Sequence, residues 1–184
     1  MKLFIYGAGG HAKVVAESAI NLEHISEIFF VDDKNKDKSI VSKNPNFSII
    51  FESDISDDLD DVSAIVGIGD NQIRKSVVKR CSKIPFISIT SPNATVSESA
   101  KISSGSFISS GAIINADSFI GSHTIINSGS IIEHDCFVGE NSFICPGSIV
   151  LGSCKIGKNT IIGAKNIILP KSNILNDKFI KAKI

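Results

Sequence analysis

Residues 113–150 read IINADSFIGSHTIINSGSIIEHDCFVGENSFICPGSIV, and every sixth position from Ile114 onward is aliphatic. The spacing runs unbroken through fifteen residues: Val96, Ile102, Ile108, Ile114, Ile120, Ile126, Ile132, Val138, Ile144, Val150, Ile156, Ile162, Ile168, Ile174 and Ile180. A period of six fits neither an α-helix, with about 3.6 residues per turn, nor an alternating strand. It is typical of a parallel β-helix, in which each hexapeptide supplies one short strand and one turn.

The residues just before the aliphatic ones should point outward, because side chains alternate along a strand. Three strands make an 18-residue coil, so the outward residues form three faces. The first is Thr95, Ile113, Ile131, Ile149 and Ile167; the second Lys101, Phe119, Phe137, Lys155 and Asn173; the third Phe107, Ile125, Phe143, Ile161 and Phe179. Such apolar stripes predict burial against further copies of the chain, most simply in a homotrimer. Part of the second face could instead pack against the N-terminal half.

Residues 1–90 follow a different pattern, in which short apolar runs alternate with helical stretches. The sequence predicts strands at 3–6, 28–31 and 64–68, helices at 12–22 and about 72–82, and a further segment at 85–89. Strands that alternate with helices indicate a small parallel sheet. We therefore expect an α/β, Rossmann-like domain over residues 1–90 and a β-helix over residues 91–184, separated by a turn at Pro92.

The first turn, residues 7–12, reads GAGGHA and fits the GxGxx(G/A) pattern between a strand and a helix. Such a turn brings backbone amides to a phosphate, and an acidic residue about 20 positions later suits a ribose hydroxyl. Asp32 and Asp33 stand at that distance. With only three or four strands before the repeat, a nucleotide or nucleotide-sugar fits better than a dinucleotide. The alternative is that the glycines only allow close packing of strand and helix.

The charge and cysteine content of the sequence argue against several classes of partner and of site. Nineteen basic and nineteen acidic residues cancel, and no basic cluster favours nucleic acid or an anionic membrane. No apolar run approaches about 18 residues, and the N-terminal apolar stretch is too short for a signal peptide, which predicts a cytoplasmic protein. Four cysteines without CxxC spacing argue against zinc. Cys136 and Cys154 lie one coil apart, and we expect reduced thiols rather than a disulfide.

One corner of the β-helix combines a histidine with two carboxylates, Glu133-His134-Asp135. A carboxylate beside an imidazole fixes its tautomer and raises its basicity, as a general base near neutral pH requires. The alternative is a solvated polar turn. This corner lies in the middle coils, where a neighbouring subunit would pack, and that position favours the catalytic interpretation. His123 and His24 lie elsewhere, which argues against a metal-dependent β-helix enzyme.

The sequence resembles the sialic acid O-acetyltransferase and UDP-4-amino-sugar N-acetyltransferase family of hexapeptide acyltransferases over essentially its whole length. The motifs that carry the resemblance are YGAGGHAK at 6–13, VDDK at 31–34, GIGDNQIRK at 67–75, IIEHD at 131–135 and the hexapeptide repeat. The resemblance implies a left-handed β-helix, a homotrimer and acetyl-CoA as the donor. Relatives usually continue with a GVPAK-like tail, whereas this sequence ends KAKI, which predicts weaker binding of acetyl-CoA.

The resemblance also implies roles for individual residues. His134 would be the general base, and Asp135, where some relatives carry glutamate, would raise its basicity. The amide of Gly152 would stabilise the oxyanion. The residues implied to contact the nucleotide-sugar acceptor are Gly9, Gly10, His11, Asp32, Asp33, Gly69 and Asn127. Those implied to line the path of the pantetheine arm, between adjacent subunits, are Phe143, Gly163 and Ala164.

We therefore predict an acetyl-CoA-dependent N-acetyltransferase that acts on the amino group of a nucleotide-linked amino-sugar during surface glycan synthesis. The acceptor would attack the thioester directly. Two alternatives stay open: O-acetylation of a sugar hydroxyl, as on sialic acid, and a non-catalytic trimeric scaffold that binds nucleotide-sugars. The glycine turn and the acid pair favour a nucleotide-bearing acceptor, and His134 argues against the scaffold.

Overall fold

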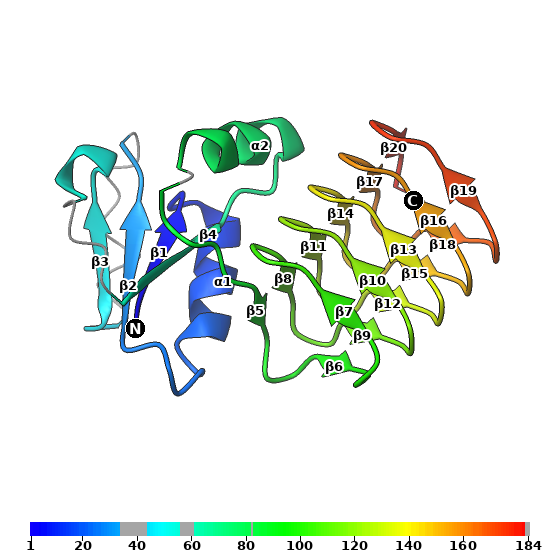
Figure 1. Ribbon diagram of the computed structural model, residues 1–184, viewed down its shortest axis with the longest axis horizontal. Coiled ribbons are helices and arrows are strands. Elements are labelled where there is room, and N and C mark those ends of the chain that lie inside the picture. Colours follow the sequence, from blue (N-terminus) through cyan, green and yellow to red (C-terminus); the bar gives the residue numbers. More distant parts are fainter. Residues whose placement is uncertain (34–43, 56–60, 82, 183–184) are drawn as a thin grey trace. The chain divides into compact units, whose positions relative to one another are not determined.

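The computed structural model describes residues 1–33, 44–55, 61–81 and 83–182. The chain divides into two compact units, Met1–Ile87 and Ser88–Ile184 (Figure 1). The described residues do not include four that the sequence analysis used: Lys34 of the VDDK motif, Ser82 at the end of the second expected helix, and Lys183 and Ile184 of the short tail.

The N-terminal unit contains a four-stranded parallel sheet in the order β3-β2-β1-β4. Its strands are β1 (Lys2–Tyr6), β2 (Glu27–Val31), β3 (Phe47–Ile50) and β4 (Val62–Val66). The sequence did not predict β3, an edge strand in which only Phe47 is buried, so its hydrophobic pattern is weak. β4 ends two residues before the expected strand does, because the chain turns at Gly67, where a Cβ would lie 2.8 Å from Cα of Ala12.

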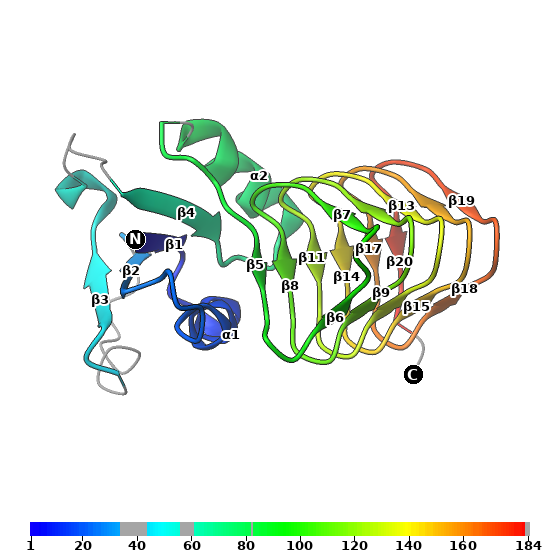
Figure 2. The same ribbon diagram turned by 60° about the horizontal axis from the view of Figure 1, so that its bottom comes forward.

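Two helices cover opposite faces of this sheet, as Figure 2 shows. They are α1 (Gly10–Ala19) and α2 (Asn71–Arg80); a short 3-10 helix, η2 (Glu52–Asp54), follows β3. Asp70 caps α2, since its carboxylate accepts from the amides of Gln72 at 2.8 Å and Ile73 at 2.9 Å. Val77 and Cys81 pack with Phe4 and Tyr6 in one core cluster. Because side chains alternate along β1, each face of the sheet presents apolar residues to one of the two helices.

The second unit is a parallel β-solenoid with three walls, visible in Figure 2. The first-face wall contains β6 (Thr95–Val96), β9 (Ile113–Ile114), β12 (Ile131–Ile132), β15 (Ile149–Val150) and β18 (Ile167–Ile168). The second-face wall contains β7 (Lys101–Ile102), β10 (Phe119–Ile120), β13 (Phe137–Val138), β16 (Lys155–Ile156) and β19 (Asn173–Ile174). The third-face wall contains β5 (Ile89–Thr90), β8 (Phe107–Ile108), β11 (Ile125–Ile126), β14 (Phe143–Ile144), β17 (Ile161–Ile162) and β20 (Phe179–Ile180).

The register confirms the 18-residue coil. Ile131 pairs with Ile149, and Phe119 pairs with Phe137, each in parallel strands of successive coils. The aliphatic residues from Ile108 to Ile162 are fully buried, whereas those of the end coils, such as Val96 and Ile180, are only partly buried. β5 pairs with β8, so Ile89–Thr90 already belongs to the solenoid.

Small polar residues in the corners tie successive coils together. The buried hydroxyl of Ser118 donates to the carbonyl of Glu133 at 2.6 Å, fifteen residues further on. The thiols of Cys136 and Cys154 do the same toward the carbonyls of Leu151 at 3.2 Å and Leu169 at 3.0 Å. All four cysteines are free, so these two act as buried hydrogen-bond donors in positions that serine otherwise fills.

The outward faces differ in exposure. Phe107 and Ile125 of the third face are only 1% exposed, so this face is not an exposed stripe throughout. Toward the C-terminal coils, Ile167 is 50% exposed and Phe179 64% exposed. On the second face, the exposed rings of Phe119 and Phe137 stack with centroids 5.3 Å apart.

Candidate functional site

The corner with the predicted base, Glu133-His134-Asp135, follows β12 and is fixed by backbone hydrogen bonds to the coils on both sides. The amide of Asp135 donates to the carbonyl of Ala116 at 3.0 Å, and the amide of Ser153 donates to the carbonyl of His134 at 2.9 Å. Asp135 adopts φ of 58°, a left-handed conformation that Asp tolerates better than most residues. The backbone therefore holds the histidine in place without help from its side chain.

The imidazole of His134 is paired with Asp135. Its Nδ1 lies 2.7 Å from Oδ2 of Asp135, and both side chains are exposed. This hydrogen bond raises the pKa of His134 above its ordinary value, and the charges of Asp135 and Glu133 act in the same direction. Glu133 in turn accepts from the amide group of Asn115 at 3.1 Å. With the Nδ1 proton directed at Asp135, the neutral imidazole presents Nε2 as an acceptor.

Gly152, one coil further on, lies directly against this ring. A Cβ there would be 2.7 Å from Nε2 and 2.8 Å from Cε1 of His134, closer than real Cβ contacts. The Gly152 amide donates to no acceptor among the residues that the structure describes. A basic nitrogen and an available backbone donor thus lie side by side, an arrangement that can accept a proton while stabilising an oxyanion.

Four of the residues predicted for the coenzyme and the acceptor lie on a different wall of the solenoid or in the turns after it. Asn127, Phe143, Gly163 and Ala164 all belong to the third-face wall or to the turns that follow it. Asn127 uses its side-chain oxygen to accept from the amide of Ser128 at 2.8 Å. A Cβ on Gly163 would meet the backbone of Ala182 in the last coil. Within one chain, the structure does not bring these four residues to the corner of His134.

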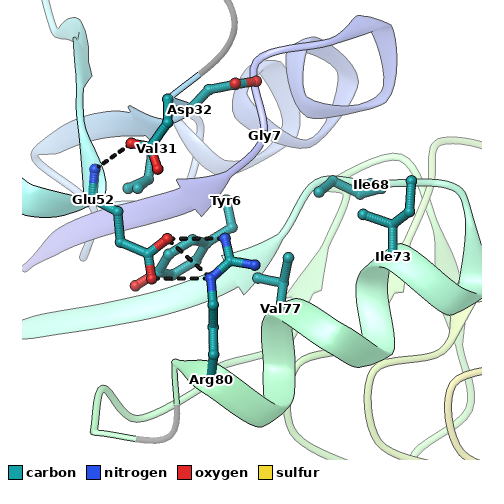
Figure 3. A pocket seen from close by; sticks show the side chains of 10 residues that line it. Tyr6, Gly7, Val31, Asp32, Glu52, Ile68, Ile73, Val77 and Arg80 are labelled. Atoms are coloured by element: carbon teal, nitrogen blue, oxygen red, sulfur yellow. Dashed lines mark hydrogen bonds and ion pairs between the residues drawn. The ribbon is translucent and has the colours of Figure 1, made fainter.

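The N-terminal unit has its own pocket, of about 560 Å³, at the carboxyl ends of its strands (Figure 3). β2 and β3 lie on one side of β1 and β4 on the other, so the strand order reverses here, where open α/β sheets bind ligands. Ten residues line it: Tyr6, Gly7, Val31, Asp32, Asp33, Glu52, Ile68, Ile73, Val77 and Arg80. Of the residues predicted to contact the acceptor, Asp32 and Asp33 line this pocket, whereas Gly9, Gly10, His11 and Gly69 are not among the lining residues.

Both predicted acids are anchored to backbone amides at this pocket. Asp32 accepts from the amide of Ala8 at 2.9 Å and so holds the glycine turn. Asp33 accepts from the amide of Glu52 at 2.8 Å. Gly7 adopts φ of 101°, and a Cβ there would lie 2.8 Å from Cγ1 of Ile68, so this position requires glycine.

His11 and Gly69 belong to a neighbouring cluster around the buried Arg74, which the sequence did not single out. Arg74 donates to the carbonyls of Ile68 and Gly69, each at 3.0 Å, and to the side chain of Asn71 at 2.7 Å. Burial, and next the charge of Arg74, lower the pKa of His11 to about 4, so His11 is neutral at pH 7. The carbonyl of Gly69 thus has a structural role in holding the loop after β4.

Sequence reasoning also missed Glu52 and Arg80. Nε of Arg80 lies 3.0 Å from Oε2 of Glu52, and Nη2 lies 2.9 Å from the same oxygen. No local motif could reveal the pair, because its members are 28 residues apart. Among the described residues, no group of three His, Cys, Asp or Glu side chains could hold a metal ion. None of the described helices has the length and apolarity needed to cross a membrane.

Two family models match the sequence. The PglD N-terminal domain matches residues 2–81, and the bacterial transferase hexapeptide model, of six repeats, matches residues 135–170. No curated protein matches the sequence. The two matches cover most of the α/β unit and the middle of the solenoid.

Solved structures resemble the chain over nearly its whole length. The acetyltransferase domain of PglB from Neisseria gonorrhoeae, in complex with acetyl coenzyme A, is 29% identical, with a TM-score of 0.89 over 98% of this chain and 88% of that one. PerB from Caulobacter crescentus, in complex with CoA and GDP-perosamine, is 26% identical, with a TM-score of 0.65 over 95% and 93%. WeeI from Acinetobacter baumannii shares the fold at 19% identity, with a TM-score of 0.71 over 98% and 97%.

The two matched families and the solved structures agree with the observed architecture, a small α/β unit followed by a hexapeptide solenoid. In fold and in both matched segments, the chain is similar to hexapeptide-repeat acetyltransferases that carry a PglD-type N-terminal domain followed by a β-helix.

Proposed function

We propose that this protein is an acetyl-CoA-dependent N-acetyltransferase that acts on the amino group of a nucleotide-linked amino-sugar. The observation that carries the proposal is the His134 corner, where Nδ1 lies 2.7 Å from Asp135 and the ring rests on Gly152. Relatives support the choice of substrates: the Neisseria domain was solved with acetyl coenzyme A and the Caulobacter protein with CoA and GDP-perosamine.

In the proposed reaction, Nε2 of His134 accepts a proton from the acceptor amine as its nitrogen attacks the thioester carbonyl carbon. Asp135 stabilises the resulting imidazolium through the hydrogen bond at Nδ1. The Gly152 amide donates to the oxyanion of the tetrahedral intermediate, a contribution worth about 10²–10³ in rate. The attack forms the carbon–nitrogen bond. Collapse of the intermediate restores the carbonyl and breaks the carbon–sulfur bond, and CoA leaves as the thiol with the proton returned from the imidazolium.

We place the acceptor's nucleotide in the pocket of the α/β unit. Asp32 is positioned by the glycine turn to accept from a ribose hydroxyl, as acidic residues do in related nucleotide-binding turns. Gly9, Gly10, His11 and Gly69 remain predicted acceptor contacts outside the lined pocket. Surface glycan synthesis in the cytoplasm remains the predicted setting.

The proposed enzyme is a homotrimer whose site is completed between subunits. His134 and Gly152 follow the first-face wall, whereas Asn127, Phe143, Gly163 and Ala164 belong to the third-face wall and its turns. A second copy could bring the third-face group to the His134 corner, so that the pantetheine arm lies between two chains. Exposed Ile167 and Phe179 give each of these two walls apolar surface to bury in such contacts.

The test is release of CoA from acetyl-CoA in the presence of UDP-, dTDP- and GDP-linked amino-sugars and of free sialic acid. His134→Asn should lose acetyl transfer by orders of magnitude while keeping its oligomeric state. His123→Asn is the matched control, since it removes the histidine of another corner. Near-normal turnover by His134→Asn would exclude the general base, and preference for sialic acid would favour O-acetylation.

A further inference from the structure

The nucleotide pocket has a polar end that the proposed reaction does not use. There, Arg80 at the end of α2 meets Glu52, which follows β3. Nε and Nη2 of Arg80 are both engaged by the Glu52 carboxylate at 2.9–3.1 Å, which fixes the guanidinium plane. Nη1 has no partner among the described residues, so its two N–H groups are available at the pocket lining.

The protein side supports this ion pair with a further hydrogen bond. The thiol of Cys81 donates to Oε1 of Glu52 at 3.4 Å, and the buried Tyr6 also lines the pocket. The carboxylate of Glu52 is therefore saturated by Arg80 and Cys81. What remains for a ligand at this end is the Nη1 donor of Arg80 and Oδ2 of Asp33, whose Oδ1 is held by the Glu52 amide.

One face of α2 connects this polar end with the glycine turn. Ile73, Val77 and Arg80 are spaced i, i+4 and i+7, so they line the pocket along one side, about 10 Å from first to last. Figure 3 shows Ile68 beside Ile73 and away from Arg80. Gly7 packs against Ile68, which places the glycine turn at the apolar end.

This order matches a nucleotide laid along the pocket. Phosphates would lie at the glycine turn, the ribose near Asp32, and the base along the apolar face, where Ile73 is 54% exposed although it is apolar. The edge of the base furthest from the ribose would then reach the polar end, where Arg80 and Asp33 both line the pocket. That edge carries the exocyclic group of the base, next to a ring nitrogen.

We propose that Arg80, held by Glu52, recognises the base by donating from Nη1 to its exocyclic carbonyl oxygen while Asp33 accepts from the adjacent ring N–H. This inference rests on the proposed nucleotide-sugar function. Uracil, thymine and guanine all present a carbonyl oxygen beside a ring N–H. Cytosine and adenine present an amino group beside an unprotonated nitrogen, so a donor would face Arg80 and an acceptor would face Asp33. The site is therefore specific for keto bases.

The test is calorimetric titration of the full-length protein with UDP and CDP, which differ only at this edge, and with GDP and ADP. The native protein should bind UDP over CDP, and GDP over ADP, by about tenfold or more. Arg80→Gln should reduce both preferences to within about threefold. Lys79→Gln, which removes an exposed cation from the same helix, should leave them unchanged.

Thermal unfolding of each variant checks the fold. If Arg80→Gln unfolds, the double variant Glu52→Gln/Arg80→Gln replaces the ion pair by two neutral amides and is titrated instead. Equal affinity of the native protein for all four nucleotides would overturn the role of Arg80 and leave the proposed function standing. If both variants retain the preference for UDP over CDP and for GDP over ADP, the role of Arg80 is likewise overturned and the proposed function stands. Failure of every nucleotide to bind would overturn this inference together with the nucleotide-bearing acceptor.

Discussion

Replacement of Gly152 by alanine is the sharpest test of the His134 corner. The added Cβ would lie 2.7 Å from Nε2, 2.8 Å from Cε1 and 3.3 Å from Cδ2 of His134. Ordinary contact begins at 3.4 Å, so the imidazole must move by more than half an ångström. Gly152 is not among the residues with positive φ, so alanine fits its backbone and the clash is confined to the ring.

We expect Gly152→Ala to lower kcat/KM for acetyl transfer by about 100-fold, because misplacing a catalytic group by about 1 Å costs that much. Stability should change by less than about 0.5 kcal/mol, since the displaced ring is exposed. The measurements are steady-state CoA release and thermal unfolding. An NMR titration should also show the pKa of His134 falling toward its ordinary value as the ring leaves Asp135.

A double-variant cycle supplies the control. In a His134→Ala background there is no ring to displace, so the added methyl should have little further effect on the residual rate. Undiminished turnover by Gly152→Ala would refute the reasoning. So would an equal loss from the added methyl in the His134→Ala background, because the methyl would then act on something other than the imidazole.

Two further predictions concern titrating groups. Asp135→Asn suits the left-handed backbone but removes the carboxylate whose hydrogen bond, and next whose charge, raise the pKa of His134. The acidic limb of the pH–rate profile should move to lower pH, and the maximal rate should fall by about 10- to 100-fold. An unmoved limb would contradict the pairing. The pKa of His11 is lowered to about 4 in the folded state from its ordinary value of 6.5, so the unfolded chain binds the proton first as pH falls. The neutral His11 should therefore contribute about 3 kcal/mol to the free energy of unfolding above pH 6.5, and this contribution should be lost progressively toward pH 4. Urea unfolding at a series of pH values measures it. His11→Gln should abolish this pH-dependent part of the stability, whereas His24→Gln, at an exposed position, should not. Equal pH profiles of stability for the two variants would contradict the prediction.

Much of the solenoid could be predicted because its determinants are local and repeat. Each hexapeptide places one aliphatic residue inside, and the next coil is always 18 residues away, as the pairing of Ile131 with Ile149 shows. The same arithmetic places Gly152 next to His134, because they too are 18 residues apart. The edge strand β3 escaped prediction, since only Phe47 in it is buried and no period marks it.

The sequence by itself therefore determined the solenoid, the α/β unit in front of it, and the adjacency of His134, Asp135 and Gly152. Only the tertiary structure decided which pocket residues meet. Glu52 and Arg80 are 28 residues apart and come together only because β3 and the end of α2 pack at the same pocket. Likewise, only folding buries Arg74 beneath the loop it holds and keeps His11 neutral. A repeat transmits its contacts through a fixed spacing, whereas a sheet with crossover connections joins distant segments, and no spacing in the chain encodes such contacts.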